Sequence, residues 1–126
     1  FFLVISVVRA AETMSSTESE VEALEKGEIL TEEEPGKWAG KQGTHVPTAS
    51  KEGQEVVIKV GHGMASDHWI QYIWARSKDG KLLGGVKLAH TDTPELKITL
   101  PAGIDTIVAF ESCNLHGVWK KEFIFR

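Results

Sequence analysis

Short runs of apolar and β-branched residues, separated by turn signals, dominate the chain after residue 35. Residues 55–60 read Glu-Val-Val-Ile-Lys-Val, and residues 95–100 alternate Leu96, Ile98 and Leu100 with polar neighbours. Similar runs cover residues 69–76, 82–88, 106–110 and 118–125, and we expect one further strand near residues 45–49. Asp79-Gly80 predicts a hairpin between two of these runs. About seven short strands at this spacing, without a credible helix after residue 35, predict an all-β sandwich.

The first 35 residues follow a different pattern. Residues 1–8 are apolar, but eight residues are too few to span a bilayer, which needs about 20. Two interpretations remain open: residues 1–11 are the remnant of a signal peptide, which would imply export, or they precede a natural start at Met14. We favour the second, and with it a cytoplasmic location.

Residues 15–35 are rich in serine and glutamate and poor in large apolar side chains. They predict a solvated arm that is disordered or weakly helical, with one helical turn around Val21 to Leu24. We therefore divide the chain into an N-terminal extension, residues 1–35, and one folded domain, residues 36–126.

Charge is spread unevenly over these two parts. The net charge is −4. Residues 1–35 contain Arg9 and Lys26 against nine glutamates, which gives −7, whereas residues 36–126 contain twelve Lys and Arg against nine Asp and Glu, which gives +3. The basic charges are too few and too scattered for a nucleic-acid partner. No apolar run is long enough to predict a membrane partner.

Candidate chemistry is concentrated in one cysteine and five histidines. A single cysteine, Cys113, excludes an intrachain disulfide and a four-cysteine metal site. Four of the histidines lie at predicted strand breaks: His45, His62, His68 and His116. Loops at one end of a sandwich can converge, and a Cys-x-x-His step brings sulfur and imidazole near one point.

Each of these residues also has a structural interpretation. His62 lies between two glycines and could be a turn residue, and His68 could pack on Trp69. A lone cysteine is most often a buried packing residue. The joint occurrence of four loop histidines with the only cysteine nevertheless favours a metal site. We expect the fifth histidine, His90, to be a surface residue, because its turn carries no partner motif.

Three segments together carry a family resemblance. They are His45-Val46-Pro47, His62-x5-His68-x-Ile70-x-x-Ile73 and Cys113-Asn114-Leu115-His116-Gly117-x-Trp119. Over residues 36–126 this set resembles the superoxide reductases, also called neelaredoxins or desulfoferrodoxins. The resemblance implies an immunoglobulin-like β-sandwich that holds one mononuclear non-haem iron, cycling between Fe2+ and Fe3+. It implies His45, His62, His68 and His116 as equatorial ligands and Cys113 as the axial ligand.

The resemblance also implies a reaction and partners. The chain would be an enzyme that reduces superoxide by one electron to hydrogen peroxide, with a rubredoxin-like electron donor and assembly as a homotetramer. It would be of the one-iron type, because no N-terminal four-cysteine module is present. Asn114, Leu115 and Gly117 would surround the sulfur, with backbone N–H groups as donors. The alternative is a non-catalytic metal-binding sandwich or carrier module, with zinc as a competing ion.

The sequence departs from the family pattern at one place. Many superoxide reductases have Glu-Lys directly before the first ligand histidine, and this chain has Gly43 and Thr44 there. We therefore expect no glutamate that closes the open metal position. Lys41 is the leading candidate for guiding superoxide, although a solvated loop lysine explains it equally well. Lys120 and Lys121 are the other candidates for electrostatic steering.

Overall fold

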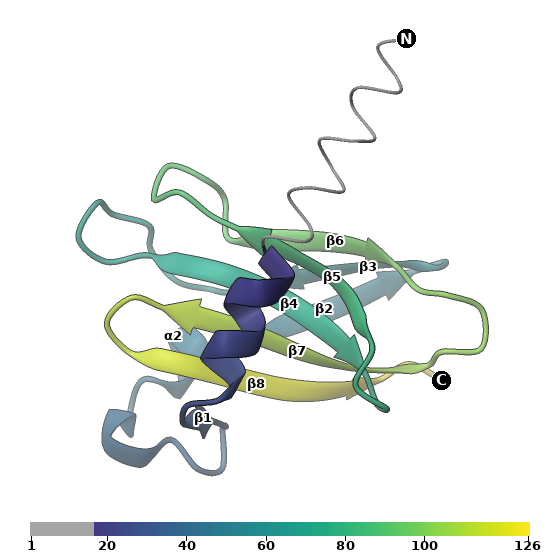
Figure 1. Ribbon diagram of the computed structural model, residues 1–126, viewed down its shortest axis with the longest axis horizontal. Coiled ribbons are helices and arrows are strands. Elements are labelled where there is room, and N and C mark those ends of the chain that lie inside the picture. Colours follow the sequence, from purple (N-terminus) through teal and green to yellow (C-terminus); the bar gives the residue numbers. More distant parts are fainter. Residues whose placement is uncertain (1–16) are drawn as a thin grey trace, which may run out of the picture.

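Eight strands form two packed sheets in the computed structural model, which describes residues 17–126 (Figure 1). The strands of the larger sheet follow the order β1-β8-β7-β4-β5, and those of the smaller sheet β2-β3-β6. Their bounds are β1 Ile29–Leu30, β2 Thr48–Glu52, β3 Glu55–Lys59, β4 Ile70–Ser77, β5 Leu82–Lys87, β6 Glu95–Thr99, β7 Thr106–Cys113 and β8 Gly117–Ile124. The predicted all-β, immunoglobulin-like sandwich is confirmed. Seven of the eight strands were predicted, and the eighth is β1, which has two residues.

The main core lies between the two sheets. Alternation along β3 and β6 turns one face of each strand inward, and this face carries Val56, Ile58, Leu96 and Ile98. The larger sheet contributes Ile73, Ala75, Ile107 and Ala109 from β4 and β7. Full burial of one such valine or isoleucine is worth about 1.5–3 kcal/mol. This core therefore fixes the positions of the loops at the strand ends.

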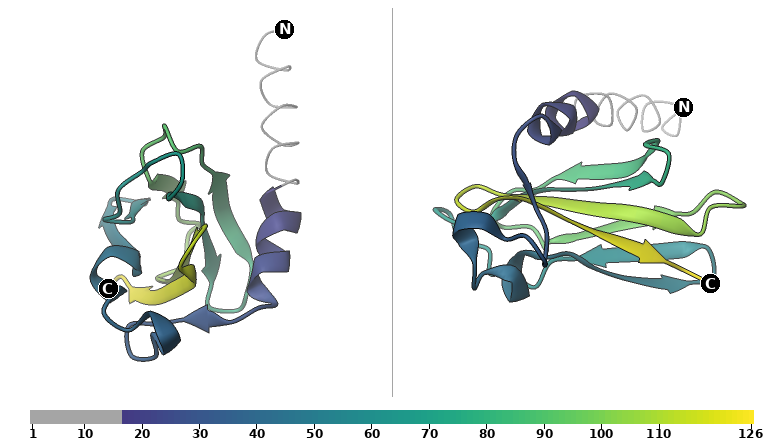
Figure 2. Two further views of the ribbon diagram at one scale, coloured as in Figure 1. Left: turned by 90° about the vertical axis from the view of Figure 1, so that its left-hand side faces the viewer. Right: turned by 90° about the horizontal axis from the view of Figure 1, so that it is seen from below.

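A helix at residues 17–25 lies across the outer face of the larger sheet (Figure 2). Val21 is fully buried there and packs in a cluster with Trp74, Phe110 and Val118. The helical turn expected near Val21 to Leu24 is confirmed and is longer than expected. The solvated arm is wrong for this segment, because Thr17 and Val21 share one helix face and both are buried.

Glu25 fastens the end of this helix to β4. Its carboxylate accepts hydrogen bonds from the indole N–H of Trp74, at 2.9 Å, and from two guanidinium nitrogens of Arg76, at 2.7 and 2.8 Å. Planar two-point pairs of this kind hold both partners in one orientation.

Compartment and domain boundary are left as predictions. No helix within residues 17–126 is long and apolar enough to cross a membrane. The suggested signal remnant and the candidate start at Met14 lie outside the described residues. The division of the chain after residue 35 also stays a prediction.

Three segments meet at one end of the sandwich. Ile70, the first residue of β4, is paired with Cys113, the last residue of β7, so the β3–β4 loop lies beside the β7–β8 turn. The third segment holds a 3-10 turn, η1 Gly36–Trp38, and a short helix, α2 Gln42–His45. The strand expected at residues 45–49 begins at Thr48 instead, because His45 closes α2 and the chain is extended only from Val46, directly before Pro47.

Candidate metal centre

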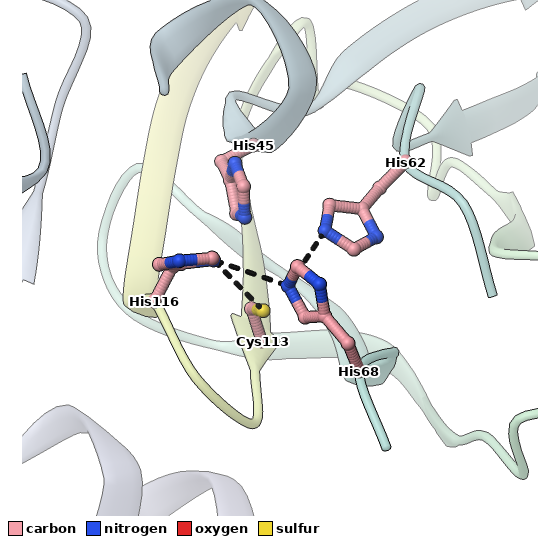
Figure 3. Close-up of side chains that lie close together, drawn as sticks. All are labelled: His45, His62, His68, Cys113 and His116. Atoms are coloured by element: carbon pink, nitrogen blue, oxygen red, sulfur yellow. Dashed lines mark hydrogen bonds between the residues drawn. The ribbon is translucent and has the colours of Figure 1, made fainter. Parts of the chain in front are cut away.

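Four histidines and the cysteine from these three segments converge on one point (Figure 3). Each residue offers one nitrogen or sulfur atom, and all five atoms lie within 4.8 Å of one another. The residues are His45, His62, His68, Cys113 and His116. The predicted cluster is therefore brought together, while His90 is exposed and lies outside it, against Trp69.

His45 is held by the backbone of its own helical turn. The residue is 1% exposed, and its Nδ1 lies 2.9 Å from the carbonyl oxygen of Lys41. A carbonyl only accepts, so Nδ1 carries the proton and Nε2 presents a lone pair. Nε2 is buried and has no hydrogen-bond partner in the described part of the chain. A buried polar atom without a partner is costly, and a metal ion would satisfy it.

The β3–β4 loop brings His62 and His68 together. Ala65 and His68 exchange backbone hydrogen bonds of 3.0 and 3.1 Å, which fold the loop back on itself. The two Nε2 atoms then lie 3.1 Å apart. Nδ1 of His62 donates to the carbonyl oxygen of Gly63, so this ring also presents Nε2 to the cluster.

The β7–β8 turn supplies Cys113 and His116. The strand predicted at residues 106–110 continues to Cys113, which is the last residue of β7 and pairs with Gly117 at the start of β8. Gly117 has a φ of 81°, a conformation that side chains disfavour and glycine adopts freely. Nδ1 of His116 lies 3.8 Å from the cysteine sulfur and 3.1 Å from Nε2 of His68.

Asn114 ties this turn to the neighbouring loop. Its Oδ1 accepts the backbone N–H of Trp69 at 2.9 Å, and its Nδ2 donates to the carbonyl oxygen of Asp67 at 3.0 Å. Oδ1 also lies 4.0 Å from the Cys113 sulfur. The side chain predicted to surround the sulfur thus also fixes the spacing between the two loops that carry His68 and His116.

The Cys113 sulfur lies on the inner side of the cluster, where the residue is 4% exposed. Burial raises the pKa of its thiol, whereas the backbone N–H groups of Leu115 and His116 act in the opposite direction. Such N–H groups stabilise the thiolate form, which is the form that binds metals. Of the other two predicted neighbours, Leu115 exposes 53% of its surface and Gly117 shapes the turn.

The four imidazoles are arranged as a square. Centroids of neighbouring rings lie 4.6 Å apart for His45–His62, 4.4 Å for His62–His68, 4.8 Å for His68–His116 and 4.9 Å for His116–His45. The diagonal pair His45–His68 is 6.4 Å apart. A tetrahedral set would give equal separations, so four short sides and a long diagonal indicate a planar set.

The donor atoms fit one metal ion. Two nitrogens at right angles on one ion, with bonds of about 2.1 Å, lie about 3.0 Å apart. The measured separations of 3.1 Å match this value. Burial lowers the pKa of His45 to about 4, and burial also lowers the pKa of His62 and His116. These rings are therefore neutral at pH 7, as metal ligands must be.

A hollow of about 560 Å³ opens on the face of the square. All four histidines line it, together with Lys41, Thr44 and Asp67, whereas the buried Cys113 does not. Asp67 is the one carboxylate among the described residues that line it, and no glutamate is among them. Lys120 and Lys121 line a different hollow, and Lys121 is paired with Glu32 at 2.9 Å.

Two further residues near the cluster were not among the residues predicted from the sequence. Trp38 packs against the ring of His116. The two residues lie far apart in the sequence, so no local pattern predicts this contact. Glu111 lies two residues before Cys113, is fully buried, and has neither carboxylate oxygen paired in the described structure. A charged residue within the apolar run of β7 was the available signal for Glu111.

Comparison with known proteins gives consistent matches. The family model described as Desulfoferrodoxin matches residues 37–122. The desulfoferrodoxin of Nitratidesulfovibrio vulgaris is 34% identical over 103 residues, which are 76% of this chain and 75% of that protein. The desulfoferrodoxin homolog of Archaeoglobus fulgidus is 33% identical over 79 residues, and the match spans 60% of each protein's length.

One solved structure supports the same relationship. The superoxide reductase of Treponema pallidum is 33% identical and has a TM-score of 0.58, with 65% of this chain and 67% of that chain covered. The similarity therefore extends from sequence to fold.

Proposed function

This chain belongs to the desulfoferrodoxin family, and on that premise we propose that it is a superoxide reductase that converts superoxide to hydrogen peroxide by one-electron reduction at one iron ion. His45, His62, His68, His116 and Cys113 would hold the iron. The observation that carries the proposal is the square of imidazoles, closed by a buried sulfur on one side and open to a hollow on the other. Iron bound there supplies the one-electron redox couple that the reaction needs.

The chain's own residues prepare this site in two ways. Hydrogen bonds from His45 and His62 to backbone carbonyls fix the ring orientations. Backbone N–H groups of Leu115 and His116 stabilise negative charge on the sulfur. The site is therefore organised before any ion binds.

Lys41 would guide the substrate. It is exposed, lines the hollow, and its positive charge contributes to the lowered pKa of His116, after the larger effect of burial. A cation at the mouth of a small site raises the local concentration of an anion such as superoxide. We propose Lys41 as the substitute for the family's lysine, in a site that lacks a glutamate lid.

The main rival, a structural zinc module, fits this geometry less well. Zinc in structural sites almost always takes four ligands in a tetrahedron. The five donors and the square of rings do not provide that arrangement. The remaining parts of the proposal, a rubredoxin-like donor and a homotetramer, rest on the family resemblance alone.

The decisive experiment loads the purified protein with Fe(II) under anaerobic conditions and follows superoxide decay by pulse radiolysis. We expect fast second-order consumption, hydrogen peroxide as product without release of oxygen, and a visible thiolate-to-iron(III) charge-transfer band after oxidation. His62→Ala should abolish the reaction, whereas His90→Ala, which removes the exposed histidine outside the cluster, should leave it unchanged.

Zinc-loaded protein is the matched metal control, since it has no redox couple and should be inactive. Oxygen release in a superoxide dismutation stoichiometry would contradict the proposal. Equal activity of the His62→Ala variant would place the reaction outside this cluster.

A further inference from the structure

The ring of His116 has no hydrogen bond to a backbone carbonyl among the described residues, unlike the rings of His45 and His62. His45 and His62 each donate from Nδ1 to a backbone carbonyl oxygen, and such a bond normally sets the rotation of a ligand imidazole. Nε2 of His116 makes no hydrogen bond to any of residues 17–126. Its other nitrogen, Nδ1, points at the cluster. Within the described structure, the ring of His116 therefore lacks the hydrogen bond to a backbone carbonyl that orients His45 and His62.

Trp38 contacts this ring. Its ring centroid lies 4.6 Å from that of His116, and the two planes meet at 82°. Edge-to-face contacts at this distance are the favourable arrangement of aromatic rings, because the positive edge of one ring meets the negative face of the other. The contact depends on ring orientation, so it can fix the rotation of the imidazole as a hydrogen bond does.

The backbone on both sides gives Trp38 a fixed place. Gly36 begins the η1 turn with a φ of 56°, the Trp38 N–H donates to the carbonyl oxygen of Pro35, and the Lys41 N–H donates to that of Trp38, both at 3.0 Å. Across the contact, Gly117 has no side chain. A Cβ there would lie 4.0 Å from the indole nitrogen of Trp38, an ordinary van der Waals distance, so the indole lies directly beside the first residue of β8.

A second tryptophan holds the main chain of the same histidine. The indole N–H of Trp119 donates to the carbonyl oxygen of His116 at 2.8 Å. Trp119 is fully buried in β8, so this bond fixes the peptide while leaving the imidazole free to rotate. Trp119 therefore holds the backbone of His116, and Trp38 contacts its ring.

We propose that Trp38 is a positioning residue that sets the ring plane of His116 within the ligand set. The inference rests on the proposed role of His116 as a ligand. It does not depend on which reaction the bound metal performs.

The test compares Trp38→Leu with Trp38→Phe in the full chain. In metal-free protein, NMR of the His116 ring protons should show a large change in chemical shift for Trp38→Leu and a smaller one for Trp38→Phe. Iron affinity, measured by competition with a chelator, should fall about tenfold for Trp38→Leu, the low end of the effect of losing a group that orients a metal ligand. The iron affinity of Trp38→Phe should stay close to that of the parent protein.

Trp69→Leu is the matched control. Trp69 follows the ligand His68 directly, but its ring faces His90, which lies outside the cluster. This variant should leave the His116 ring signals in place. The charge-transfer band of oxidised iron protein should shift for Trp38→Leu and not for the control.

Unchanged His116 ring signals and unchanged iron affinity in Trp38→Leu would overturn the inference. If that variant does not fold, Trp38→Phe still decides, since a retained aromatic contact predicts near-normal signals and affinity. Iron protein that responds to Trp38→Leu but fails to reduce superoxide would refute the proposed function and leave the positioning role intact.

Discussion

The backbone carbonyl oxygen of Lys41 accepts a hydrogen bond from Nδ1 of His45, at 2.9 Å. The two residues are four apart, one turn of helix, and the bond holds His45 with Nε2 toward the cluster. The side chain of Lys41 meanwhile lines the hollow on the open face. Lys41 therefore orients a histidine of the cluster through its main chain and places a positive charge at the hollow through its side chain. Substitution can separate these two effects.

Lys41→Ala should slow superoxide reduction about tenfold at low ionic strength and flatten the dependence of the rate on salt, because only the side-chain charge is removed. The backbone bond to His45 remains, so the iron spectrum should not change. Pulse radiolysis over a series of salt concentrations measures this. Lys78→Ala, in the turn at the opposite end of β4, is the control and should behave as the parent protein. An unchanged rate constant for Lys41→Ala would make Lys41 a bystander.

Local patterns predicted most strands because each buries one face. The alternation of Leu96, Ile98 and Leu100, and the run around Ile58, specify inward faces directly. The histidines at strand breaks were informative for a related reason, since strand ends of a sandwich gather at its two ends.

Other features depend on distant contacts that sequence does not encode locally. The two residues of β1 become a strand through parallel pairing with Val118 and Trp119 of β8. The Gln42–His45 turn has no apolar periodicity, so nothing distinguished it from an extended approach to Pro47. The helix at residues 17–25 was only partly predicted, because its inward face is narrow. That face consists of Thr17, Val21 and Leu24.

Asn114→Ala should lower the free energy of unfolding by about 1–2 kcal/mol, because two hydrogen bonds that join the loops carrying His68 and His116 are lost. Iron binding should weaken as well, since the spacing between His68 and His116 depends on those loops. Urea denaturation of the metal-free protein and chelator competition measure the two effects. Gln54→Ala removes an exposed amide elsewhere and should change neither. Unaltered stability in Asn114→Ala would show that other contacts hold the loops.

Glu111→Met should raise the free energy of unfolding of the metal-free protein by about 1–3 kcal/mol at neutral pH. The carboxylate is buried without a partner in the described structure, and methionine fills a similar volume with no polar group. Chemical denaturation compares this variant with Glu122→Met, an exposed site where the change should be within about 0.5 kcal/mol. A clear loss of stability in Glu111→Met would mean that the carboxylate has a stabilising partner in solution.

Glu25 should stabilise the protein in a pH-dependent manner. Burial raises the pKa of Glu25. Hydrogen bonds from Arg76 and Trp74, together with the Arg76 charge, lower it by a larger amount, so the folded pKa lies below the ordinary value. A lowered pKa means that the ionised group contributes stability above its unfolded pKa, and that this contribution is lost as pH falls through the folded pKa. Of the groups facing this pair, Glu18 and Glu22 on the same helix also interact with Arg76.

Glu25→Gln should therefore lower the free energy of unfolding by about 1 kcal/mol at pH 7 and by clearly less at pH 3, where the parent carboxylate is itself becoming protonated. Urea denaturation at both pH values gives the comparison. Glu22→Gln is the matched control, because Glu22 is exposed on the same helix and makes no hydrogen bond to Arg76 within residues 17–126. An equal loss at both pH values would show that the Glu25 side chain acts through packing and not through its charge. The helix would then be held on the sheet by Val21 and its apolar neighbours alone.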